Sequence, residues 1–260
     1  MGDRFADNEE DSLIIYGRNA VLEAFRSGKT IDRLYVQEGV ADGTLQSILR
    51  TAKKTDAIIN FVSKDRLNKY AEGDKHQGVV AMAAAYNYAD VEDILNAAKE
   101  KDEPPFIIVL DDIEDPHNLG AIIRTANQAG AHGVIIPKHR AVGLTAAVAR
   151  ASAGAINYTP VAKVTNINKT MKELKDAGMW FVCADMSGEK MYNIDLTGSI
   201  GLIIGNEGDG VSESVKKNCD FIASIPMKGN IDSLNASVAC GVLAYEIVRQ
   251  RIAKGANYEK

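Results

Sequence analysis

The stretch FIIVLDDIEDPHNLGAIIRTANQAGAHGVIIP, residues 106–137, decides the fold class. It begins with an unbroken apolar run, FIIVL, which is typical of a strand buried on both faces of a parallel sheet. Apolar residues at helical spacing follow over 118–129, and GVIIP at 133–137 is a second short apolar run. A strand, a helix and a strand in this order predict a β-α-β unit, in which the two strands run parallel.

The same alternation continues toward the end of the chain. Strands are expected at 158–163, 179–185, 201–205 and 221–227, and helices at 144–155, 166–177, 211–218 and 236–253. Strands that alternate with helices in this way predict an α/β domain with a mostly parallel sheet, and we place it at residues 106–258.

A second, smaller α/β unit is expected at residues 12–85. Its strands are expected at 13–17, 31–37, 57–62 and 78–85, and its main helices at 18–27 and 42–54. Residues 86–105 hold a short helix of mixed charge and end in a Pro pair, so we expect a linker there. The first eleven residues, MGDRFADNEED, are acidic and polar, and we expect a disordered arm rather than a secretory signal.

Composition limits the possible functions. The chain has 260 residues, of which 46% are hydrophobic and 25% are charged, and no apolar run approaches the ~20 residues that span a bilayer. Its three cysteines form no CxxC pair and its four histidines have no metal-ligand spacing, so we expect a cytoplasmic protein without a disulfide framework or a metal site. The net charge of −5 argues against a general nucleic-acid coat. Residues 12–88, however, hold 11 Lys and Arg against 8 Asp and Glu. This mildly basic part of the chain fits a module that contacts RNA.

Three stretches carry side chains that a plain scaffold does not require. In the first, DPHNLGAIIRTANQAG (115–130), Asn118 and Arg124 stand in an otherwise apolar helix. Taken alone, Asn118 fits a helix cap and Arg124 fits a solvated surface residue. The pair is therefore informative only together with the other two stretches.

The second stretch is LIIGNEGDGVS, residues 202–212, where an apolar strand runs directly into a glycine-rich loop. Loops at the ends of such strands bind ligands in open α/β sheets, and glycine allows a close approach of the backbone. The GxxGxG spacing matches neither a dinucleotide-binding loop nor a Walker A loop. Glu207 would repel a phosphate, which favours an adenosine or amino-acid ligand with cationic character.

The third stretch is SIPMKGNIDSLNASVACGVLAYEI, residues 224–247, where a polar loop leads into the long final helix. Ser233 and Asn235 lie at the start of this helix, where backbone N–H groups are free. Either residue alone is also explained as a simple helix cap.

Together these stretches resemble the motifs of the SpoU (TrmH) family of RNA ribose 2′-O-methyltransferases, in the SPOUT superfamily. NLGAIIRTA, LIIGNEGDGVS and IPMKGNIDSLNASVA match the first, second and third motif of the family. The N-terminal unit, with YGRNAVLEAF and HQGVVA, resembles the L30e-like substrate-binding domain of the bacterial subgroup that methylates a guanosine of large-subunit (23S) ribosomal RNA. The resemblance covers nearly the whole chain.

The resemblance implies the fold and the partners. The C-terminal domain would contain a deep trefoil knot, with the second and third motifs as the loops that hold S-adenosylmethionine (AdoMet). It would also form a homodimer through this domain, with each active site at the subunit interface. For the cofactor, the resemblance implies contacts from Gly205, Asn206, Gly210, Ile225, Leu234 and Ala236.

The resemblance also implies catalytic roles. Arg124 would lie at the ribose 2′-hydroxyl, held by a substrate phosphate. Because arginine keeps its proton, with a pKa of ~12 or above, we expect it to stabilise the developing alkoxide, and proton removal by Arg124 stays open. Asn118, Ser233 and Asn235 would orient the nucleotide and Arg124, and Glu207 would anchor Arg124 or the loop.

Basic residues of the N-terminal unit are the expected RNA contacts. We single out Arg18 and Asn19, early in its first helix, and Arg26 and Lys29, near the end of that helix. A normally solvated basic face is the alternative interpretation.

Three other functions are alternatives on the sequence. The substrate could be a tRNA or another ribosomal RNA site, or the protein could be a non-catalytic RNA-binding factor in ribosome assembly. Such a factor is disfavoured because Arg124, Glu207, Ser233 and Asn235 are all present. A nicotinamide-dependent oxidoreductase would need a GxGxxG loop with an acidic partner, which the chain lacks.

Overall fold

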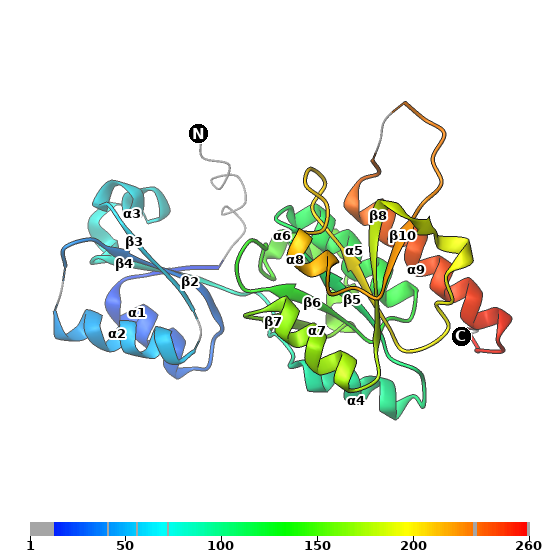
Figure 1. The fold of residues 1–260 in the computed structure, drawn as a ribbon. Helices are drawn as coiled ribbons and strands as arrows, with labels where there is room; N and C mark the ends of the chain where they lie inside the picture. Colours follow the sequence, from blue (N-terminus) through cyan, green and yellow to red (C-terminus); the bar gives the residue numbers. More distant parts are fainter. Residues whose placement is uncertain (1–12, 41, 56, 72, 231–232, 259–260) are drawn as a thin grey trace. The chain divides into compact units, whose positions relative to one another are not determined.

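The computed structural model describes residues 13–258, apart from residues 41, 56, 72 and 231–232 (Figure 1). The chain divides into two compact units. Of the described residues, one unit contains those up to Asn87 together with Gly143–Ala147, and the other contains the rest from Tyr88 onward. The arm expected at residues 1–11 lies outside the described residues.

The N-terminal unit is a four-stranded sheet with helices on both faces. Its strands stand in the order β1 (Leu13–Tyr16), β4 (Val79–Ala83), β2 (Ile31–Gln37) and β3 (Ile58–Val62). Strand β4 is antiparallel to β1 and β2, whereas β2 and β3 are parallel. Helices α1 (Arg18–Arg26) and α2 (Gly43–Lys54) bury apolar side chains against one face, and α3 (Lys64–Tyr70) packs on the other.

The C-terminal unit is built on a six-stranded sheet in which every pair of neighbours is parallel. The strand order is β10 (Phe221–Ser224), β8 (Trp180–Lys190), β9 (Ile200–Ile204), β5 (Phe106–Leu110), β6 (Gly133–Pro137) and β7 (Val161–Val164). The expected α/β class with a parallel sheet is confirmed. The chain passes from β9 across β8 to the edge strand β10 and then returns, which is compatible with the knot that the resemblance implies.

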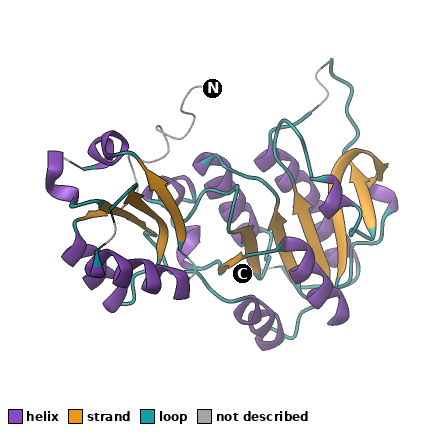
Figure 2. Ribbon diagram, turned by 60° about the vertical axis from the view of Figure 1, so that its left-hand side comes forward, coloured by secondary structure: helices purple, strands orange, loops and turns teal. Residues whose placement is uncertain are grey.

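Helices cover both faces of this sheet (Figure 2). Helix α5 (Pro116–Gln128) packs against α9 (Ala236–Ala253), which also contacts β8 and β9. Helices α4 (Val91–Glu100), α7 (Ile167–Asp176) and α8 (Glu213–Lys216) bury side chains in the core of the opposite face. The short helix α6 (Ala146–Ala151) follows β6. Among the described residues, no helix is long and apolar enough to cross a membrane.

The linker expected at residues 86–105 is corrected by the structure. Most of this segment belongs to the C-terminal unit, which begins at Tyr88. Helix α4 lies within it, and Ile94 is fully buried beside Ile135 and Phe181. The mixed charge of the helix led to the linker prediction, but its apolar residues are spaced so that one face joins the core.

Two strand ends also differ from the expectation. Strand β8 continues to Lys190, with a bulge: Ile222 pairs with Cys183, but the next residue, Ala223, pairs with Glu189. Strand β10 ends at Ser224 instead of residue 227. The residues between Cys183 and Glu189 therefore leave the regular pairing, and they do so at the edge of the sheet where the ligand-binding loops lie.

Candidate functional site

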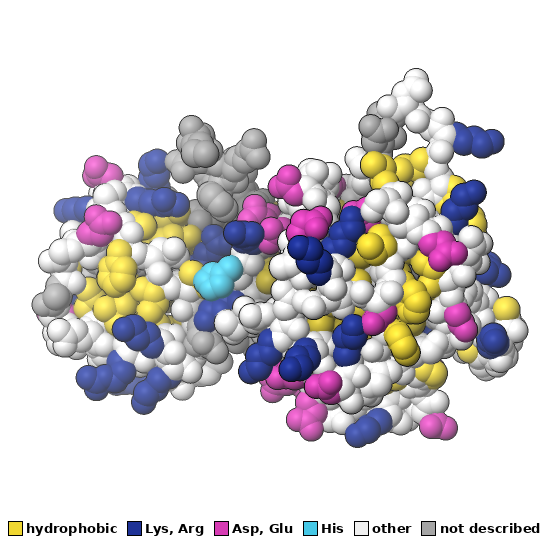
Figure 3. All heavy atoms as spheres, viewed as in Figure 1, with side chains coloured by type: hydrophobic (Ala, Val, Ile, Leu, Met, Phe, Trp, Pro, Cys, Tyr) yellow, Lys and Arg dark blue, Asp and Glu magenta, His cyan; other side chains and the backbone are white. Residues whose placement is uncertain are grey.

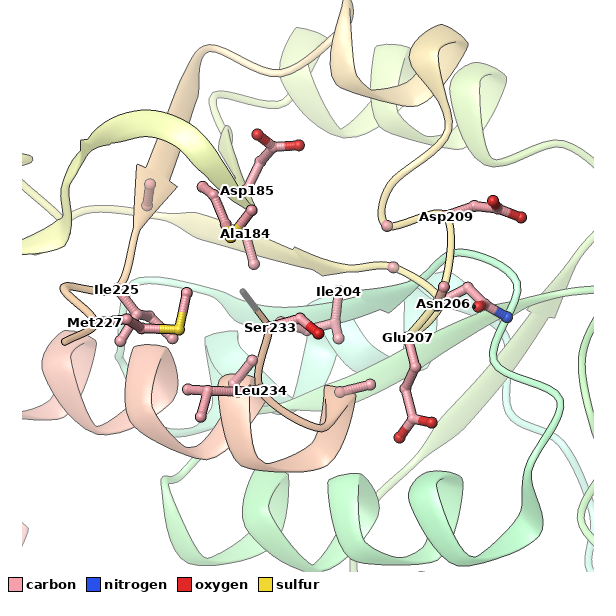
Figure 4. Close-up of a pocket in the computed structure, with 17 residues that line it drawn as sticks. Ala184, Asp185, Ile204, Asn206, Glu207, Asp209, Ile225, Met227, Ser233 and Leu234 are labelled. Atoms are coloured by element: carbon pink, nitrogen blue, oxygen red, sulfur yellow. Dashed lines mark hydrogen bonds between the residues drawn. The ribbon is translucent and has the colours of Figure 1, made fainter. Parts of the chain in front are cut away.

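A cavity of about 270 Å³ opens beside the bulge of β8 and the carboxyl ends of β9 and β10 (Figure 4). Ile204, Ile225 and Leu234 provide apolar walls, and Asp185 and Glu207 are among its acidic lining residues. All six residues that were expected to contact the cofactor line it: Gly205, Asn206, Gly210, Ile225, Leu234 and Ala236. The segments that form it are far apart in the chain and meet because parallel strands place their following loops at one edge.

The glycine-rich loop after β9 is a tight turn closed by its own backbone. The backbone N–H of Asn206 donates to the carbonyl of Gly210 at 3.1 Å, and the backbone N–H of Gly210 donates to the carbonyl of Asn206 at 3.0 Å. A Cβ atom on Gly205 would lie 2.1 Å from the carbonyl carbon of Gly210. The glycine at 205 is therefore required by the close approach of the loop to itself, and not only by a ligand as the sequence suggested.

Asn206 fixes this turn to the rest of the sheet edge. Its side-chain amide donates to the carbonyl of Asp112 at 3.0 Å, and its Oδ1 accepts from the N–H of Gly208 at 2.7 Å. At the other end of the loop, the N–H of Ser212 donates to the carboxylate of the buried Asp111 at 2.8 Å. The loop is thus held at both ends by the two residues that follow β5.

Three residues, one from each motif, form a single hydrogen-bond network. The amide of Asn118 donates to Oε1 of Glu207 at 2.9 Å, and the amide of Asn235 donates to Oδ1 of Asn118 at 3.0 Å. The Asn235 amide also donates to Oε1 of Glu207. Figure 4 shows the Glu207 side chain extending from the loop toward α5. Glu207 therefore binds two amides rather than Arg124, the partner considered for it from the sequence.

Asn235 has a second role at the start of α9. Its Oδ1 accepts from the backbone N–H groups of Ser237, at 2.9 Å, and Val238, at 3.3 Å. This caps the helix and fixes the side chain, so that its amide nitrogen is aimed at the network. The helix cap that the sequence predicted for Asn235 is therefore present, and the same side chain also joins the network with Asn118 and Glu207.

Arg124 is not brought to the cavity. Within the described part of the chain, it is exposed and forms no hydrogen bond or ion pair. It lies six positions after Asn118, which on a helix turns it about 120° away from that residue. Ser233, in contrast, lines the cavity. The chain therefore brings four of the five predicted catalytic residues to the cavity or its network and leaves the arginine exposed.

Asp185 is a cavity residue that the sequence did not reveal. It lies in the bulge of β8 and accepts from Lys216 of α8 at 2.7 Å and from the N–H of Ser187 at 2.8 Å. Burial alone raises the pKa of Asp185, but the hydrogen bonds from Lys216 and Ser187 outweigh it and lower the pKa to about 2. The carboxylate stays charged at neutral pH. No motif marks it, because its partner is 31 positions away.

The predicted RNA contacts of the N-terminal unit do not form one cluster. Arg18 lies at the start of α1 and is ion-paired with Asp42 at 2.6 Å, and Asn19 beside it is exposed. Arg26 and Lys29 are exposed at the other end of the helix, about 12 Å away along its axis. The two ends of α1 therefore present separate basic positions.

The cavity suits a ligand that has both apolar surface and positive charge. Apolar walls can enclose a flat ring, while the carboxylate of Glu207, which has only neutral amides as partners in its network, favours a cation and disfavours a phosphate. Among the described residues, no cluster of His, Cys, Asp and Glu has the arrangement that holds a metal ion. The site can therefore bind a cationic nucleoside-like ligand and fix its loops through neutral amides.

Comparisons with known proteins agree with this geometry. The model of the "SpoU rRNA Methylase family" matches residues 105–245, and that of "RNA 2'-O ribose methyltransferase substrate binding" matches residues 14–89. The chain is 48% identical to the Bacillus subtilis protein YacO, named as a TrmH family tRNA/rRNA methyltransferase, over 91% of this chain and 95% of that protein. A Staphylococcus haemolyticus protein of the same family name is 44% identical over 95% and 99%.

A solved structure gives the same result for the fold and the ligand. The SpoU methyltransferase AviRb from Streptomyces viridochromogenes, in complex with the cofactor AdoMet, matches with a TM-score of 0.59 and 27% identity. The match covers 97% of this chain and 95% of AviRb.

Proposed function

This chain belongs to the SpoU (TrmH) family of RNA methyltransferases, which use AdoMet to methylate ribose 2′-hydroxyls, and from that premise we propose that its target is a guanosine of 23S ribosomal RNA. We also propose that it acts as a homodimer. The observation that carries the catalytic part is the network of Asn118, Glu207 and Asn235 beside the cavity.

The residues present fit AdoMet. The faces of its adenine are apolar, like the cavity walls formed by Ile225 and Leu234, and its sulfonium is a cation, which the carboxylate of Glu207 favours. The backbone around Gly205 and Gly210 offers N–H and carbonyl groups to the polar parts of the molecule. When bound, AdoMet supplies a methyl group that is already activated by the sulfonium.

The chain then has to position the ribose hydroxyl and to manage its proton. A ribose hydroxyl is a weak acid, so a positive group near the developing alkoxide lowers the barrier. Arg124 is the expected group, as a stabiliser of the alkoxide, with proton removal by the same side chain as the second possibility. Asn118, Ser233 and Asn235 orient the nucleotide by neutral hydrogen bonds.

A homodimer supplies the arginine that one protomer leaves outside. Val238, Tyr245 and Ile252 of α9 are each about half exposed, and their spacing of seven places them on one outward face. An apolar stripe of this kind on a helix is typical of a surface that packs against another helix. Because α9 packs beside α5, a partner docked on the stripe would also lie near α5, the helix that carries Arg124. We propose that Arg124 acts at the cavity of the partner subunit.

The ribosomal substrate is supported by the N-terminal unit. The substrate-binding model matches nearly all of it, and its sequence resembles that of the subgroup acting on a guanosine of 23S RNA. Its excess of Lys and Arg over Asp and Glu favours a polyanionic partner.

The test is methyl transfer from radiolabelled AdoMet to unmodified 23S ribosomal RNA and, separately, to unmodified total tRNA. The labelled nucleoside is then identified after digestion. Label in 2′-O-methylguanosine from ribosomal RNA alone supports the proposal. Label only in tRNA overturns the substrate and keeps the chemistry, whereas no label in either RNA, with AdoMet bound, favours a non-catalytic role in ribosome assembly.

A further inference from the structure

A second cavity lies in the N-terminal unit, entirely within that unit. Its volume is about 260 Å³, and its lining includes Arg18, Gln37, Lys64, His76, Gln77 and Gly78. These residues come from the start of α1, the end of β2, the start of α3 and the turn before β4. None of these residues is among those assigned to methyl transfer. Any function of this cavity is therefore separate from the methyl-transfer step.

We propose that this cavity, lined by Arg18, Gln37, Lys64 and Gln77, binds one unpaired nucleotide of the RNA substrate. This inference rests on the proposed function, because it assigns part of the substrate recognition to a defined place.

The turn at residues 75–78 is rigidly built. The imidazole of His76 is buried, accepts from the N–H of Gly78 at 2.9 Å through Nδ1, and contacts Oδ1 of Asn68 at 2.9 Å through Nε2. With Nδ1 as the acceptor, Nε2 is the protonated nitrogen that donates to Asn68. His76 thereby connects the turn to α3, and both sides of the cavity keep their positions.

Gln77 has a backbone conformation that few side chains adopt. Its φ is +51°, in the left-handed region, which is uncommon for a residue other than glycine. Its Oε1 accepts from the backbone N–H of Arg18 at 3.2 Å, and its carbonyl accepts from Nε of Arg18 at 3.0 Å. These bonds fix Gln77 against α1 and leave its amide nitrogen available. Unusual backbone conformations of this kind are often found at functional sites.

Gln37 supplies a second free amide. Its backbone N–H donates to the carbonyl of Gly78 at 2.9 Å, but its side chain forms no hydrogen bond within the described residues. An amide offers a donor and an acceptor together, which is the pattern needed to read the edge of a nucleobase. Two amides on one cavity therefore favour a base as the ligand, in preference to a simple anion.

The size and the charge of the cavity agree with a nucleotide. The volume of about 260 Å³ is close to the lower limit of about 300 Å³ for small-molecule pockets, so the cavity has room for at most one nucleotide. Arg18 and Lys64 add positive charge to the cavity lining, and the Arg18 guanidinium is also ion-paired with Asp42 at 2.6 Å. Lys and Arg side chains are also spread over the face of this unit that Figure 3 shows. Sequence-specific RNA recognition usually targets bases that are unpaired and turned out of the helix.

The test uses two variants with the same change of charge. Gln37→Glu replaces a cavity amide with a carboxylate, which repels phosphate and removes the donor. Gln46→Glu, on the exposed side of α2, makes the same change outside the cavity and is the matched control. The affinity of the full-length protein for an unmodified 23S ribosomal RNA transcript is measured for each, together with AdoMet affinity and thermal stability.

We expect Gln37→Glu to weaken RNA binding at least ~10-fold and Gln46→Glu to change it less than ~2-fold, because only the former places the charge in the binding site. AdoMet affinity and stability should be unchanged in both. A second pair on α3 repeats the comparison: Lys64→Ala should weaken RNA binding at least ~10-fold, and Lys69→Ala should change it less than ~2-fold. Equal effects within both pairs overturn the proposal.

The experiment also separates this inference from the proposed function. If the wild-type protein methylates the transcript while Gln37→Glu binds as well as Gln46→Glu, the function stands and the nucleotide site is wrong. If no RNA is methylated but the pairs still differ in RNA affinity, the site stands and the function is wrong. The last measurement uses free mononucleotides. If a free nucleotide binds tightly while Gln37→Glu leaves the RNA affinity unchanged, the cavity is a small-molecule site and the proposal is wrong.

Discussion

The side-chain amide of Asn235 donates to Oδ1 of Asn118 at 3.0 Å, across 117 positions of sequence. Asn118 in turn donates to Glu207, so the bond is the middle of a chain that joins α5, the loop after β9 and the start of α9. Neutral amides around one carboxylate keep the loops in place without a cation. The geometry of the cavity therefore depends on the identity of each side chain as well as on its polarity.

Asn118→Asp should disrupt this network. The change removes the donor to Glu207 and places a second carboxylate against it, in a position where Asn118 is only 7% exposed. We expect methyl transfer to fall at least ~100-fold, and the free energy of unfolding to fall by about 1–3 kcal/mol, the usual cost of an unsatisfied buried polar group. Gln128→Glu, exposed on the same helix, is the control. Equal activity of the two variants would exclude a role for the network.

The two loop glycines allow a test of the turn itself. A Cβ atom at 205 would lie 2.1 Å from the carbonyl carbon of Gly210, whereas a Cβ atom at 208 would meet nothing closer than Oδ1 of Asn206 at 3.5 Å. Gly205→Ala should therefore open the turn and reduce AdoMet affinity at least ~10-fold, and Gly208→Ala should leave it within ~2-fold. Isothermal titration measures both. If the two variants bind alike, the tight turn does not shape the cofactor site.

A buried histidine predicts a loss of stability in mild acid. His132 accepts from the N–H of Phe106 through Nδ1, and burial lowers its pKa despite the neighbouring Glu103. The pKa of His132 in the folded state is below the unfolded value of about 6.5, so the imidazole is neutral in both states above that pH. There, the buried neutral His132 makes its full contribution to the stability of the fold. As the pH falls below about 6.5, the unfolded state takes up a proton first, and stability is lost until the folded pKa is reached.

The measurement is the free energy of unfolding at pH 7.5 and at pH 5.5, by chemical denaturation. We expect the difference between the two values to be smaller in His132→Gln than in the wild type. His139→Gln, at an exposed position, should keep the wild-type difference. If all three proteins lose the same stability between the two values of pH, another group is responsible.

The sequence predicted those parts of the site that depend on local pattern. Apolar runs predicted the strands, and the sequence signals of helix N-termini predicted where Asn118 and Asn235 lie. Both kinds of signal are contained in a few consecutive residues. It did not predict the bulge in β8 or the ion pair of Asp185 with Lys216, which depend on how distant strands pair. The burial of α4 was missed for the same reason, since its charged side hid the apolar face that the sheet covers.

Arg124 leads to the strongest test of the chemistry. Arg124→Ala should lower methyl transfer at least ~100-fold, a loss of about 2.7 kcal/mol of transition-state stabilisation, and should leave AdoMet affinity within ~2-fold because the side chain lies away from the cavity. Arg150→Ala, an exposed arginine on α6, is the comparison. Activity of Arg124→Ala within ~10-fold of the wild type would show that the residue was assigned wrongly.

The outward position of Arg124 further predicts that two inactive proteins can restore activity together. Ala239→Phe fills the cavity from α9 and should prevent AdoMet binding, while its own Arg124 is intact. A heterodimer of Ala239→Phe with Arg124→Ala, purified through two different tags, then contains one open cavity that faces an arginine from the partner. We expect this heterodimer to have about half the wild-type activity per dimer, since one of its two sites is complete.

If Arg124 acts on the cavity of its own protomer, neither site of the heterodimer is complete and the mixture stays inactive. If the two tagged chains do not purify together at all, the homodimer is wrong. Val238→Glu and Tyr245→Glu, which place charges on the apolar stripe of α9, should reproduce that last result with the wild-type active-site residues in place. Their activity should fall together with the dimer, because in the proposed homodimer the same helix face joins the subunits and brings Arg124 to the partner's cavity.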